Sequence, residues 1–285
     1  MAERVEILAP AKVNLRLSIL AREESGYHAL ETVFCAISLA DTVVISRGGA
    51  GIRLSVEGGV DTGPPEKNLA VRAADRFYRE LGEDAGVDIH LTKRIPSQAG
   101  LGGGSSDAAA VLRALNALHD DPLPRGELLQ LAIELGADVP FFLCGSPLAL
   151  AWGRGERLMP LTPLPSRPML VAHPRWPMST ANAFAQIAQL RGGAYHPRAV
   201  LIDLADLRSW TGVASIAMNE FELVAVDRGA IEVMRSAGAF IALLAGSGSS
   251  VFGIFETPVE RDSAALAVRG RDLGGRTWRA ETLTA

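Results

Sequence analysis

Apolar and polar residues alternate in parts of the first 60 residues and again in residues 87–95, which is the pattern of strands with one buried face. Other runs in this region are rich in β-branched residues, and Ala40-Asp41 separates two of them. A glycine-rich stretch at 48–51 supplies turn material between two of the runs. The expected strands cover residues 12–20, 32–39, 42–46, 52–56 and 87–95.

Other segments repeat their apolar residues about every four positions, which indicates one buried face of a helix. Residues 63–82 are an example, and Asn68 and Gly82 provide an N-cap and a stop. The apolar side chains that recur there are Leu69, Ala73, Phe77 and Leu81. Comparable patterns predict helices over residues 107–118, 125–136, 179–190, 218–226, 229–238 and 258–270.

The second half of the chain adds strands in mixed order with these helices. Residues 169–174 and 276–283 are expected strands, and residues 240–256 read as strand, tight glycine turn and strand. Strands and helices do not alternate strictly, so the predicted fold class is α+β. Residues 153–168 are rich in glycine, proline and polar residues, and the boundary is placed there. The predicted domains cover residues 1–156 and 157–285.

Composition excludes several classes of protein. Of the 285 residues, 48% are hydrophobic and 21% charged, so the chain can bury a core and is not a disordered protein. The net charge is −4 and no basic run exceeds Lys93-Arg94, which argues against nucleic-acid binding. No apolar stretch reaches the roughly 18 residues of a membrane span, and the first residues do not resemble a secretory signal.

Cysteine and histidine usage narrows the setting further. Cys35 and Cys144 lie far apart in apolar segments, as expected for buried thiols in a reducing cytoplasm. The five histidines form no HxxxH grouping and the chain has no CxxC, so no protein-built metal site is predicted. We therefore expect a cytoplasmic protein that binds neither nucleic acid nor membrane.

Residues 95–106 read IPSQAGLGGGSS between a predicted strand and a predicted helix. Glycines let a backbone approach a phosphate closely, and the amides at a helix N-terminus can bind it. Ser105 and Ser106 add hydroxyls for phosphate oxygens or Mg²⁺. No lysine follows the glycines as in a Walker loop, and serine stands at 105 where a dinucleotide fingerprint needs glycine. The alternative is a flexible surface loop.

Residues 96–106 resemble the ATP loop of the GHMP kinase superfamily of small-molecule kinases. APAKVNLRLSI (residues 9–19) resembles its first motif and AGSGSSVFGIF (residues 245–255) its third, a glycine turn that packs near the second. The resemblance therefore covers nearly the whole chain. GYHALETVF (residues 26–34) and LGADVPFFLCG (residues 135–145) are similar to the branch that phosphorylates 4-diphosphocytidyl-2-C-methyl-D-erythritol.

This resemblance implies a two-domain fold, with a ribosomal-protein-S5-like ATP domain followed by a ferredoxin-like α/β sandwich. It implies transfer of phosphate from ATP to the 2-hydroxyl of that cytidine diphosphate derivative, in the non-mevalonate route to isoprenoid precursors. Mg²⁺ is an expected cofactor, without identified protein ligands, and the chain is expected to be a monomer or weak homodimer. The alternatives are a kinase for another small alcohol, such as homoserine or mevalonate, and a binding protein without catalysis.

The resemblance also assigns the reacting groups. Asp138 is the base that takes the proton of the substrate hydroxyl, and Lys12 stabilises the developing charge. The ordinary alternatives are a turn residue at a helix end for Asp138 and a solvent-facing strand lysine for Lys12. Gly136 and Pro140 are expected to leave Asp138 in irregular backbone between helices. The ATP-binding residues are Lys93, Pro96, Ser97, Gln98, Ala99, Gly100, Leu101, Gly102, Gly103, Gly104, Ser105 and Ser106.

Five residues are assigned to the substrate by the same resemblance. Tyr27 stacks on the cytosine, His28 hydrogen-bonds it, and Phe184 is the opposite stacking ring. Thr180 contacts the substrate, and Asn14, two residues from Lys12 on one strand face, contacts the methylerythritol part. Surface packing in a turn remains the alternative for the first two, and core packing for Phe184. Lys93 could instead be a solvated strand end, and Asp107 stands where some family members carry Asn.

Overall fold

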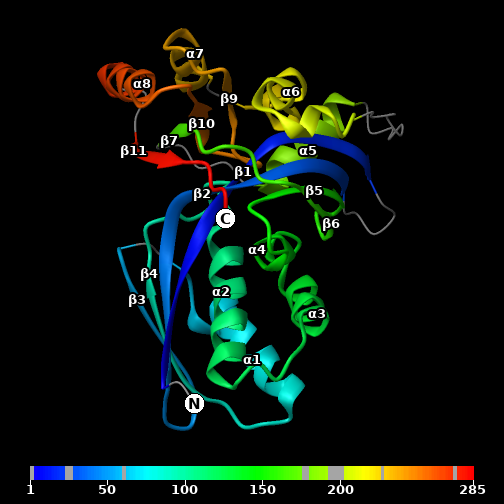
Figure 1. The fold of residues 1–285 in the computed structure, drawn as a ribbon, viewed down its shortest axis with the longest axis vertical. Helices are drawn as coiled ribbons and strands as arrows, with labels where there is room; N and C mark the ends of the chain where they lie inside the picture. Colours follow the sequence, from blue (N-terminus) through cyan, green and yellow to red (C-terminus); the bar gives the residue numbers. More distant parts are fainter. Residues whose placement is uncertain are drawn as a thin grey trace. The chain divides into compact units, whose positions relative to one another are not determined.

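The computed structural model describes residues 3–22, 28–59, 62–174, 180–191, 202–225, 228–271 and 275–285 (Figure 1). The chain forms two compact units. Unit 1 consists of Met1–Ala11, Ala40–Ser97 and Gly102–Gly145, and unit 2 of Lys12–Leu39, Gln98–Leu101 and Ser146–Ala285. Neither unit is one continuous stretch of chain. This division by packing differs from the predicted domains 1–156 and 157–285, whose boundary stays a prediction.

Unit 1 contains the beginning of β1, the end of β2, and all of β3 and β4, which follow the order β3-β4-β2-β1 in their sheet. The end of β2 pairs with β4 in antiparallel fashion, and β3 pairs with β4 in parallel. Every second residue of β4 is buried, as its alternating sequence predicts. The bounds are β1 Arg4–Arg22, β2 His28–Arg47, β3 Gly51–Glu57 and β4 Gly86–Thr92.

The helices of unit 1 pack their apolar residues against this sheet, on one side of it (Figure 1). The prediction for α1 is confirmed: the Asn68 side chain accepts a hydrogen bond from the Ala70 amide, and Gly82 ends the helix at φ 67°. The helical bounds are η1 Pro65–Lys67, α1 Leu69–Leu81, α2 Gly103–Leu118, α3 Arg125–Leu135 and α4 Val139–Leu143.

Unit 2 contains an antiparallel sheet of order β11-β7-β10-β9. In the same unit β1 pairs with β8, while β2 pairs with β5 and β5 with β6. The strand bounds are β5 Leu148–Gly153, β6 Arg157–Pro160, β7 Pro168–His173, β8 Met218–Asn219, β9 Ile241–Leu244, β10 Val251–Ile254 and β11 Arg276–Glu281. The helical bounds are α5 Thr180–Leu190, η2 Asp206–Arg208, α6 Trp210–Ile216, η3 Glu220–Leu223, α7 Gly229–Ser236 and α8 Pro258–Gly270.

The chain's last residues return to β2 within unit 2. Thr282 forms a β-bridge with Ile37, and the Leu283 amide donates to the Ala36 carbonyl at 3.0 Å. The Ser166 hydroxyl also donates to the Thr282 carbonyl at 2.8 Å. Unit 2 therefore joins a strand from the first 40 residues to the C-terminal segment.

Two sequence predictions about local structure were wrong outside residues 95–145. β2 runs through Ala40-Asp41 without a break, because neighbouring amides and Lys93 satisfy the buried Asp41 carboxylate. Residues 218–226 were expected to be a helix, but the described part forms β8 and the short η3. Residues 153–168, where the domain boundary is predicted, contain β6, which pairs with β5.

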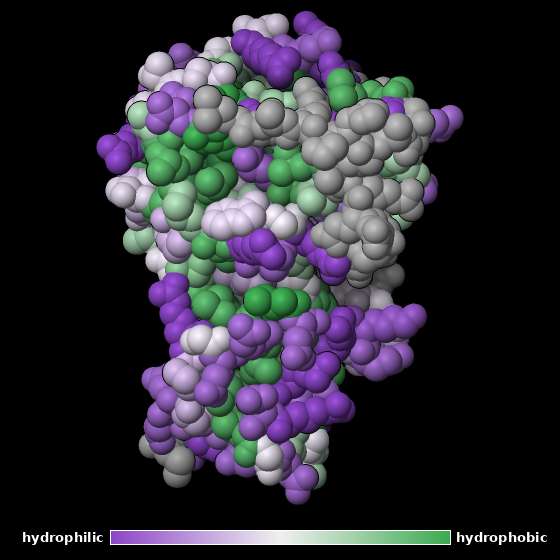
Figure 2. Space-filling view, turned by 90° about the vertical axis from the view of Figure 1, so that its right-hand side faces the viewer, coloured by the Kyte–Doolittle hydropathy of each residue, from purple (hydrophilic) through white to green (hydrophobic). Residues whose placement is uncertain are grey.

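The surface carries mixed polar and apolar side chains. On the face shown in Figure 2, hydrophilic residues cover most of the lower part, with hydrophobic residues between them. Surface ion pairs such as Arg76–Glu134 and Arg79–Asp75 belong to the helices of unit 1. None of the helices described here is both long enough and apolar enough to cross a bilayer.

His173, at the end of β7, predicts a pH dependence of stability. Its Nδ1 lies 3.0 Å from the Ser250 hydroxyl, and burial lowers the pKa of the imidazole. The unfolded state therefore binds a proton more readily than the folded state. This contribution is fully present above the ordinary histidine pKa, about 6.5, and is lost as pH falls through the lowered folded pKa. We expect the free energy of unfolding to fall on acidification.

His173→Gln should make this decline shallower, measured by urea unfolding from about pH 8 to about pH 5.5. The decline will not vanish, because burial also lowers the pKa of His119. Wild type and variant with the same dependence on pH would show that His173 does not contribute.

Candidate active site

Residues 95–106, which we call the glycine segment, are partly helical. α2 begins at Gly103, four residues before the predicted start at 107, so its first turn contains Gly103, Gly104, Ser105 and Ser106. Gly102 is the N-cap at φ 71°, and its carbonyl accepts the Ser106 amide at 2.9 Å. The first amides of such a helix have no partner within the helix and can bind an anion.

Gly103 and Gly104 serve different purposes. A Cβ at Gly103 would lie 3.0 Å from Ile95 Cγ2, so the absence of a side chain permits close packing. Gly104 is exposed, and a Cβ there would meet only Leu69 Cδ1 at 3.8 Å, an ordinary contact. The protein's own packing therefore explains Gly103 but leaves Gly104 to another cause.

Ser106 also has a feature that packing does not explain. The residue is 1% exposed, and its Oγ has no hydrogen-bond partner within the described ranges. A buried hydroxyl normally has one, and leaving it unpaired costs about 1–3 kcal/mol. An oxygen of a phosphate or the coordination shell of Mg²⁺ would satisfy this hydroxyl.

The second and third motifs are in direct contact within unit 2, which confirms that prediction. The Ser250 amide donates to the Ala99 carbonyl at 3.2 Å. Gly100 has φ 76°, and a Cβ there would lie 1.9 Å from the Ala245 carbonyl oxygen. A Cβ at Gly246 would likewise lie 2.9 Å from the Gly100 carbonyl oxygen. Only glycine permits this approach of two backbones.

Lys12 is buried in unit 2, so the solvent-facing alternative is wrong. Its amide donates to the Leu101 carbonyl at 2.9 Å, which ties the first motif to the second. Its Nζ donates to Asn14 Oδ1 at 2.9 Å and lies 5.1 Å from the centre of the Phe34 ring. Asn14 Nδ2 in turn donates to Thr32 Oγ1 at 2.7 Å. This network confirms that Lys12 and Asn14 share a strand face.

Asp138 is the N-cap residue of α4 and has helical backbone angles, φ −84° and ψ −16°. The prediction of irregular backbone up to Pro140 was wrong, because a helix resumes at Val139. Proline is tolerated in a first turn, where its missing amide has no helical partner. Asp138 belongs to unit 1 and Lys12 to unit 2, so their joint action stays a prediction.

Of the predicted cytosine-binding residues, Tyr27 lies outside the described residues. The rings of His28 and Phe184 stack on each other, with centroids 4.4 Å apart and an interplanar angle of 14°. Phe184 also packs edge-on against Phe221 at 4.8 Å. The structure thus brings two of the three predicted rings together as an aromatic pair.

The third motif has two further partners in unit 2. Thr180 Oγ1 lies 2.7 Å from Ser247 Oγ, which connects a predicted substrate residue to the glycine turn. Asn219 Nδ2 donates to the carbonyls of Leu244 and Gly246, each at 2.8 Å. Sequence reasoning missed Asn219 because its segment was interpreted as helical, and it missed Thr32 because only the folded strands pair it with Asn14.

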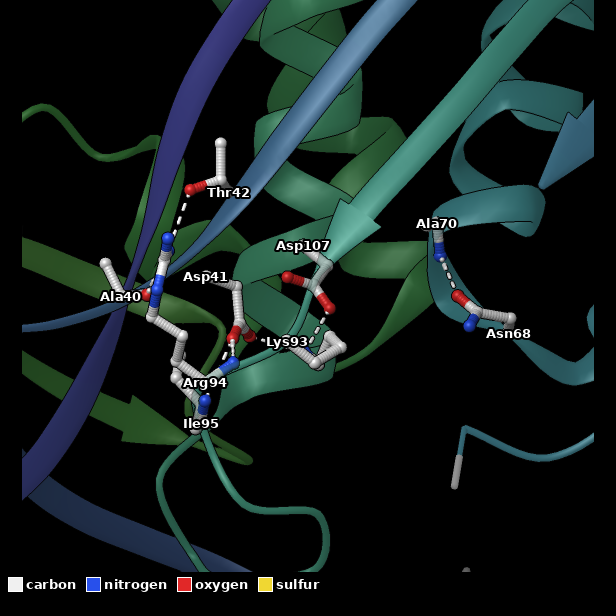
Figure 3. Close-up of polar contacts among 9 residues, drawn as sticks. All are labelled: Ala40, Asp41, Thr42, Asn68, Ala70, Lys93, Arg94, Ile95 and Asp107. Atoms are coloured by element: carbon white, nitrogen blue, oxygen red, sulfur yellow. Dashed lines mark hydrogen bonds and ion pairs between the residues drawn. The ribbon is translucent and has the colours of Figure 1, made fainter. Parts of the chain in front are cut away.

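Lys93 lies in a buried ion cluster with Asp41 and Asp107 (Figure 3). Its ammonium donates to Asp41 Oδ2, and to Asp107 Oδ2 at 2.5 Å, while its side chain is 5% exposed. The solvated alternative for Lys93 is therefore wrong, and its contact with ATP stays a prediction. Asp41 Oδ1 also accepts the amides of Arg94 at 2.5 Å and Ile95 at 2.9 Å.

The two carboxylates of this cluster compete for one cation. Burial raises the pKa of the Asp107 carboxyl to about 7; Lys93 opposes this shift, and Asp41 adds to it. For Lys93, burial lowers the pKa of the ammonium, but Asp107 and Asp41 outweigh burial and raise it. The ammonium therefore stays charged, and burial makes the Asp107 carboxyl easier to protonate than an exposed one.

Neither cysteine is exposed, and the described residues contain no cluster of three or more His, Cys, Asp or Glu side chains that could hold a metal. Cys35 and Cys144 are buried free thiols, and burial raises the pKa of Cys35 to about 12, which makes it unreactive. Within the described ranges, no three His, Cys, Asp or Glu side chains are grouped as a metal site. Oxygen atoms from the phosphates and serine hydroxyls are the donors that Mg²⁺ would meet.

Comparison with known proteins identifies the family. Residues 68–146 match the family model of the GHMP kinases N terminal domain, and residues 208–272 match that of the GHMP kinases C terminal region. Structures of mevalonate kinase from L. major (TM-score 0.70, 17% identity, 99% of this chain and 97% of that one) and of homoserine kinase from Cytophaga hutchinsonii (0.66, 21%, 99% and 95%) share the fold. These matches confirm the predicted two-domain α+β fold.

Closer relatives specify the branch. The chain is 39% identical to 4-diphosphocytidyl-2-C-methyl-D-erythritol kinase of Geobacter sulfurreducens over 97% of each chain. It is 42% identical to that of Thermus thermophilus, over 96% of this chain and 95% of that one. A crystal structure of 4-(cytidine 5'-diphospho)-2C-methyl-D-erythritol kinase aligns with TM-score 0.76 and 40% identity, covering 98% and 99%. The chain therefore belongs to the 4-diphosphocytidyl-2-C-methyl-D-erythritol kinase family of GHMP kinases.

Proposed function

We propose that this protein uses ATP to phosphorylate the 2-hydroxyl of 4-diphosphocytidyl-2-C-methyl-D-erythritol, giving the 2-phosphate and ADP in the non-mevalonate route. The observation that carries this proposal is the match to that kinase family over nearly the whole chain. Mevalonate and homoserine kinases share only the fold, at 17% and 21% identity, so their substrates are the weaker alternative. The buried free cysteines support a reducing, cytoplasmic setting.

The ATP phosphates are assigned to residues 96–106, with the first turn of α2 as the principal contact. Support comes from the exposed Gly104, the free helix amides and the buried Ser106 hydroxyl. Mg²⁺, when bound, neutralises part of the phosphate charge, and Ser105 and Ser106 are the residues that would hold it. These residues fix the phosphates while the transferred group remains free to move.

The chemical step requires a base and a stabilising cation. Asp138 accepts the proton of the substrate 2-hydroxyl while the oxygen of that hydroxyl attacks the γ-phosphorus of ATP. The bond between the γ-phosphorus and the β–γ bridging oxygen breaks, and ADP leaves. Lys12 stabilises the charge that develops on the phosphoryl oxygens. The buried network that fixes Lys12 through Asn14 and Thr32 supports this role, because a rigid cation needs no reorganisation during transfer.

The cytidine end is assigned to Tyr27, His28 and Phe184, with Thr180 and Asn14 nearer the reacting alcohol. The stacked pair of His28 and Phe184 supports this assignment, since a cytosine ring binds to flat aromatic faces.

The substrate assignment is tested by ADP release with three alcohols in parallel. We expect turnover with 4-diphosphocytidyl-2-C-methyl-D-erythritol and none above background with mevalonate or homoserine. Turnover with only mevalonate or only homoserine would overturn the substrate assignment but would still show that the protein is a kinase.

Gly104→Ala tests the phosphate site separately from the fold. The Cβ has room within the protein, and alanine should stabilise the helix by about 0.4–1 kcal/mol. If a phosphate lies against this backbone, the same Cβ displaces it and weakens one or two charge-assisted hydrogen bonds. The KM for ATP should then rise roughly 10- to 100-fold.

Gly126→Ala is the matched control, since Gly126 is also the second residue of a helix in unit 1 and has open space around its Cβ. Both variants should resist heat at least as well as wild type, but only Gly104→Ala should lose ATP affinity. An unchanged KM for ATP in Gly104→Ala would remove the first turn of α2 from the phosphate site.

A further inference from the structure

The ion cluster of Lys93, Asp41 and Asp107 connects the two ends of the glycine segment (Figure 3). At the start of the segment, the amides of Arg94 and Ile95 donate to Asp41 Oδ1. At the end of the segment, Asp107, the residue directly after the first turn of α2, accepts from Lys93 Nζ. Asp41 on β2 therefore binds the start of the segment, and Lys93 links Asp41 to Asp107 at its end.

Packing reinforces this connection. The side chain of Ile95 lies so close to Gly103 that a Cβ there would be 3.0 Å from Ile95 Cγ2. The same Cβ would be 3.6 Å from Asp41 Oδ2, so the helix start also contacts the cluster. The segment is therefore closed at its base by an apolar contact and by the ion cluster, both within unit 1.

Stability alone is a poor reason for this cluster. Removing charges from water costs several kcal/mol per ion, and well-packed apolar residues often stabilise a core better than a buried ion pair. The charge balance also matters for an anion site, because an unpaired carboxylate directly after the first turn of α2 would repel phosphates. Lys93 offsets that charge without facing solvent.

We propose that Lys93, Asp41 and Asp107 are positioning residues for ATP: they fix the two ends of the glycine segment so that the amides of the first turn of α2 stay aligned on the phosphates. This inference rests on the proposed phosphate site. It gives Lys93 an indirect role, through the segment, in place of a direct contact with ATP.

Asp107→Ala is the test variant, because it removes the contact of Lys93 with the end of the segment. Asp41 stays bound to Lys93 and to the amides of Arg94 and Ile95. The KM for ATP should rise about tenfold, while the KM for the cytidine substrate stays within about twofold of wild type. Asp107→Asn should restore most of the ATP affinity, since the amide oxygen can still accept from Lys93.

Asn116→Ala is the control at the other end of α2. Asn116 is buried and binds Asp121 Oδ1 at 3.1 Å, the Leu123 carbonyl at 3.0 Å and the Leu123 amide at 3.0 Å. Its loss should lower the melting temperature without changing the KM for ATP. Equal KM values for ATP in Asp107→Ala and wild type, or an equal rise in Asp107→Ala and Asn116→Ala, would overturn the proposal.

Calorimetric binding of a non-hydrolysable ATP analogue separates this inference from the proposed function. Weaker binding in both Gly104→Ala and Asp107→Ala supports the positioning role. Weaker binding in Gly104→Ala alone leaves the phosphate site in place and rejects the positioning role. Unchanged binding in Gly104→Ala rejects the phosphate site on which the inference rests.

Discussion

Asp138→Asn should lower kcat by roughly 10²-fold or more while leaving the KM values for both substrates near those of wild type. Asparagine keeps the size and hydrogen-bonding ability of the side chain, but its amide cannot accept the hydroxyl proton. Asp138 is half-buried and makes no hydrogen bond from its side chain to the helix that it precedes, so a capping role is not lost. Single-turnover transfer from labelled ATP measures the chemical step directly.

Asp120→Asn provides the control for the same change of chemistry. Asp120 follows α2 in unit 1 at φ 61°, a conformation that asparagine tolerates well. Its kcat should equal that of wild type. If Asp138→Asn retains full phosphoryl transfer, Asp138 is not the base, and catalysis depends on Lys12 and on substrate positioning.

Lys12→Met should also lower kcat, by roughly 10²- to 10³-fold, because removing one preorganised charge stabiliser typically has an effect of this size. Methionine keeps an apolar stem of similar length, but the ammonium over the Phe34 ring is lost and Asn14 Oδ1 loses its donor at 2.9 Å. We expect little change in the KM for ATP, since the proposed phosphate contacts are amides of another segment. Steady-state ADP release with both substrates varied separates kcat from the two KM values.

Lys67→Met is the control, because Lys67 is exposed in η1. The melting temperature of each variant should be compared with wild type before rates are interpreted. A folded Lys12→Met enzyme with wild-type kcat would limit Lys12 to a structural role between Leu101 and Asn14.

The sequence predicts local structure well where one physical signal dominates. α1 has a four-residue apolar period, an N-cap at Asn68 and a glycine stop at Gly82, and all three agree with the structure. The start of α2 was placed too late because glycine has low helix propensity, yet Gly103 and Gly104 are helical. Contacts with Ile95 that arise only on folding favour the helical position of Gly103.

The sequence also predicts those site residues that lie in a motif, but not those whose partners are distant in the chain. Motifs place Lys12 and Asn14 on one strand face, and the structure adds that both are buried. Thr32 and Asn219 could not be found from sequence because each acts through partners far away in the chain. Asp41 interrupts an apolar pattern, and only the fold supplies the amides and the lysine that let it continue a strand.

The pairing of Ala36 and Ile37 with Leu283 and Thr282 constrains how unit 2 folds while the chain is being synthesised. Leu283 and Thr282 are synthesised long after Ala36 and Ile37, so this edge of β2 stays unpaired while the intervening residues are made. Ser38 waits similarly for the Glu281 amide, 243 positions later. This edge of unit 2 can therefore be completed only after residue 283 has been made, and a chain cut short before residue 282 should leave Ala36 and Ile37 unpaired.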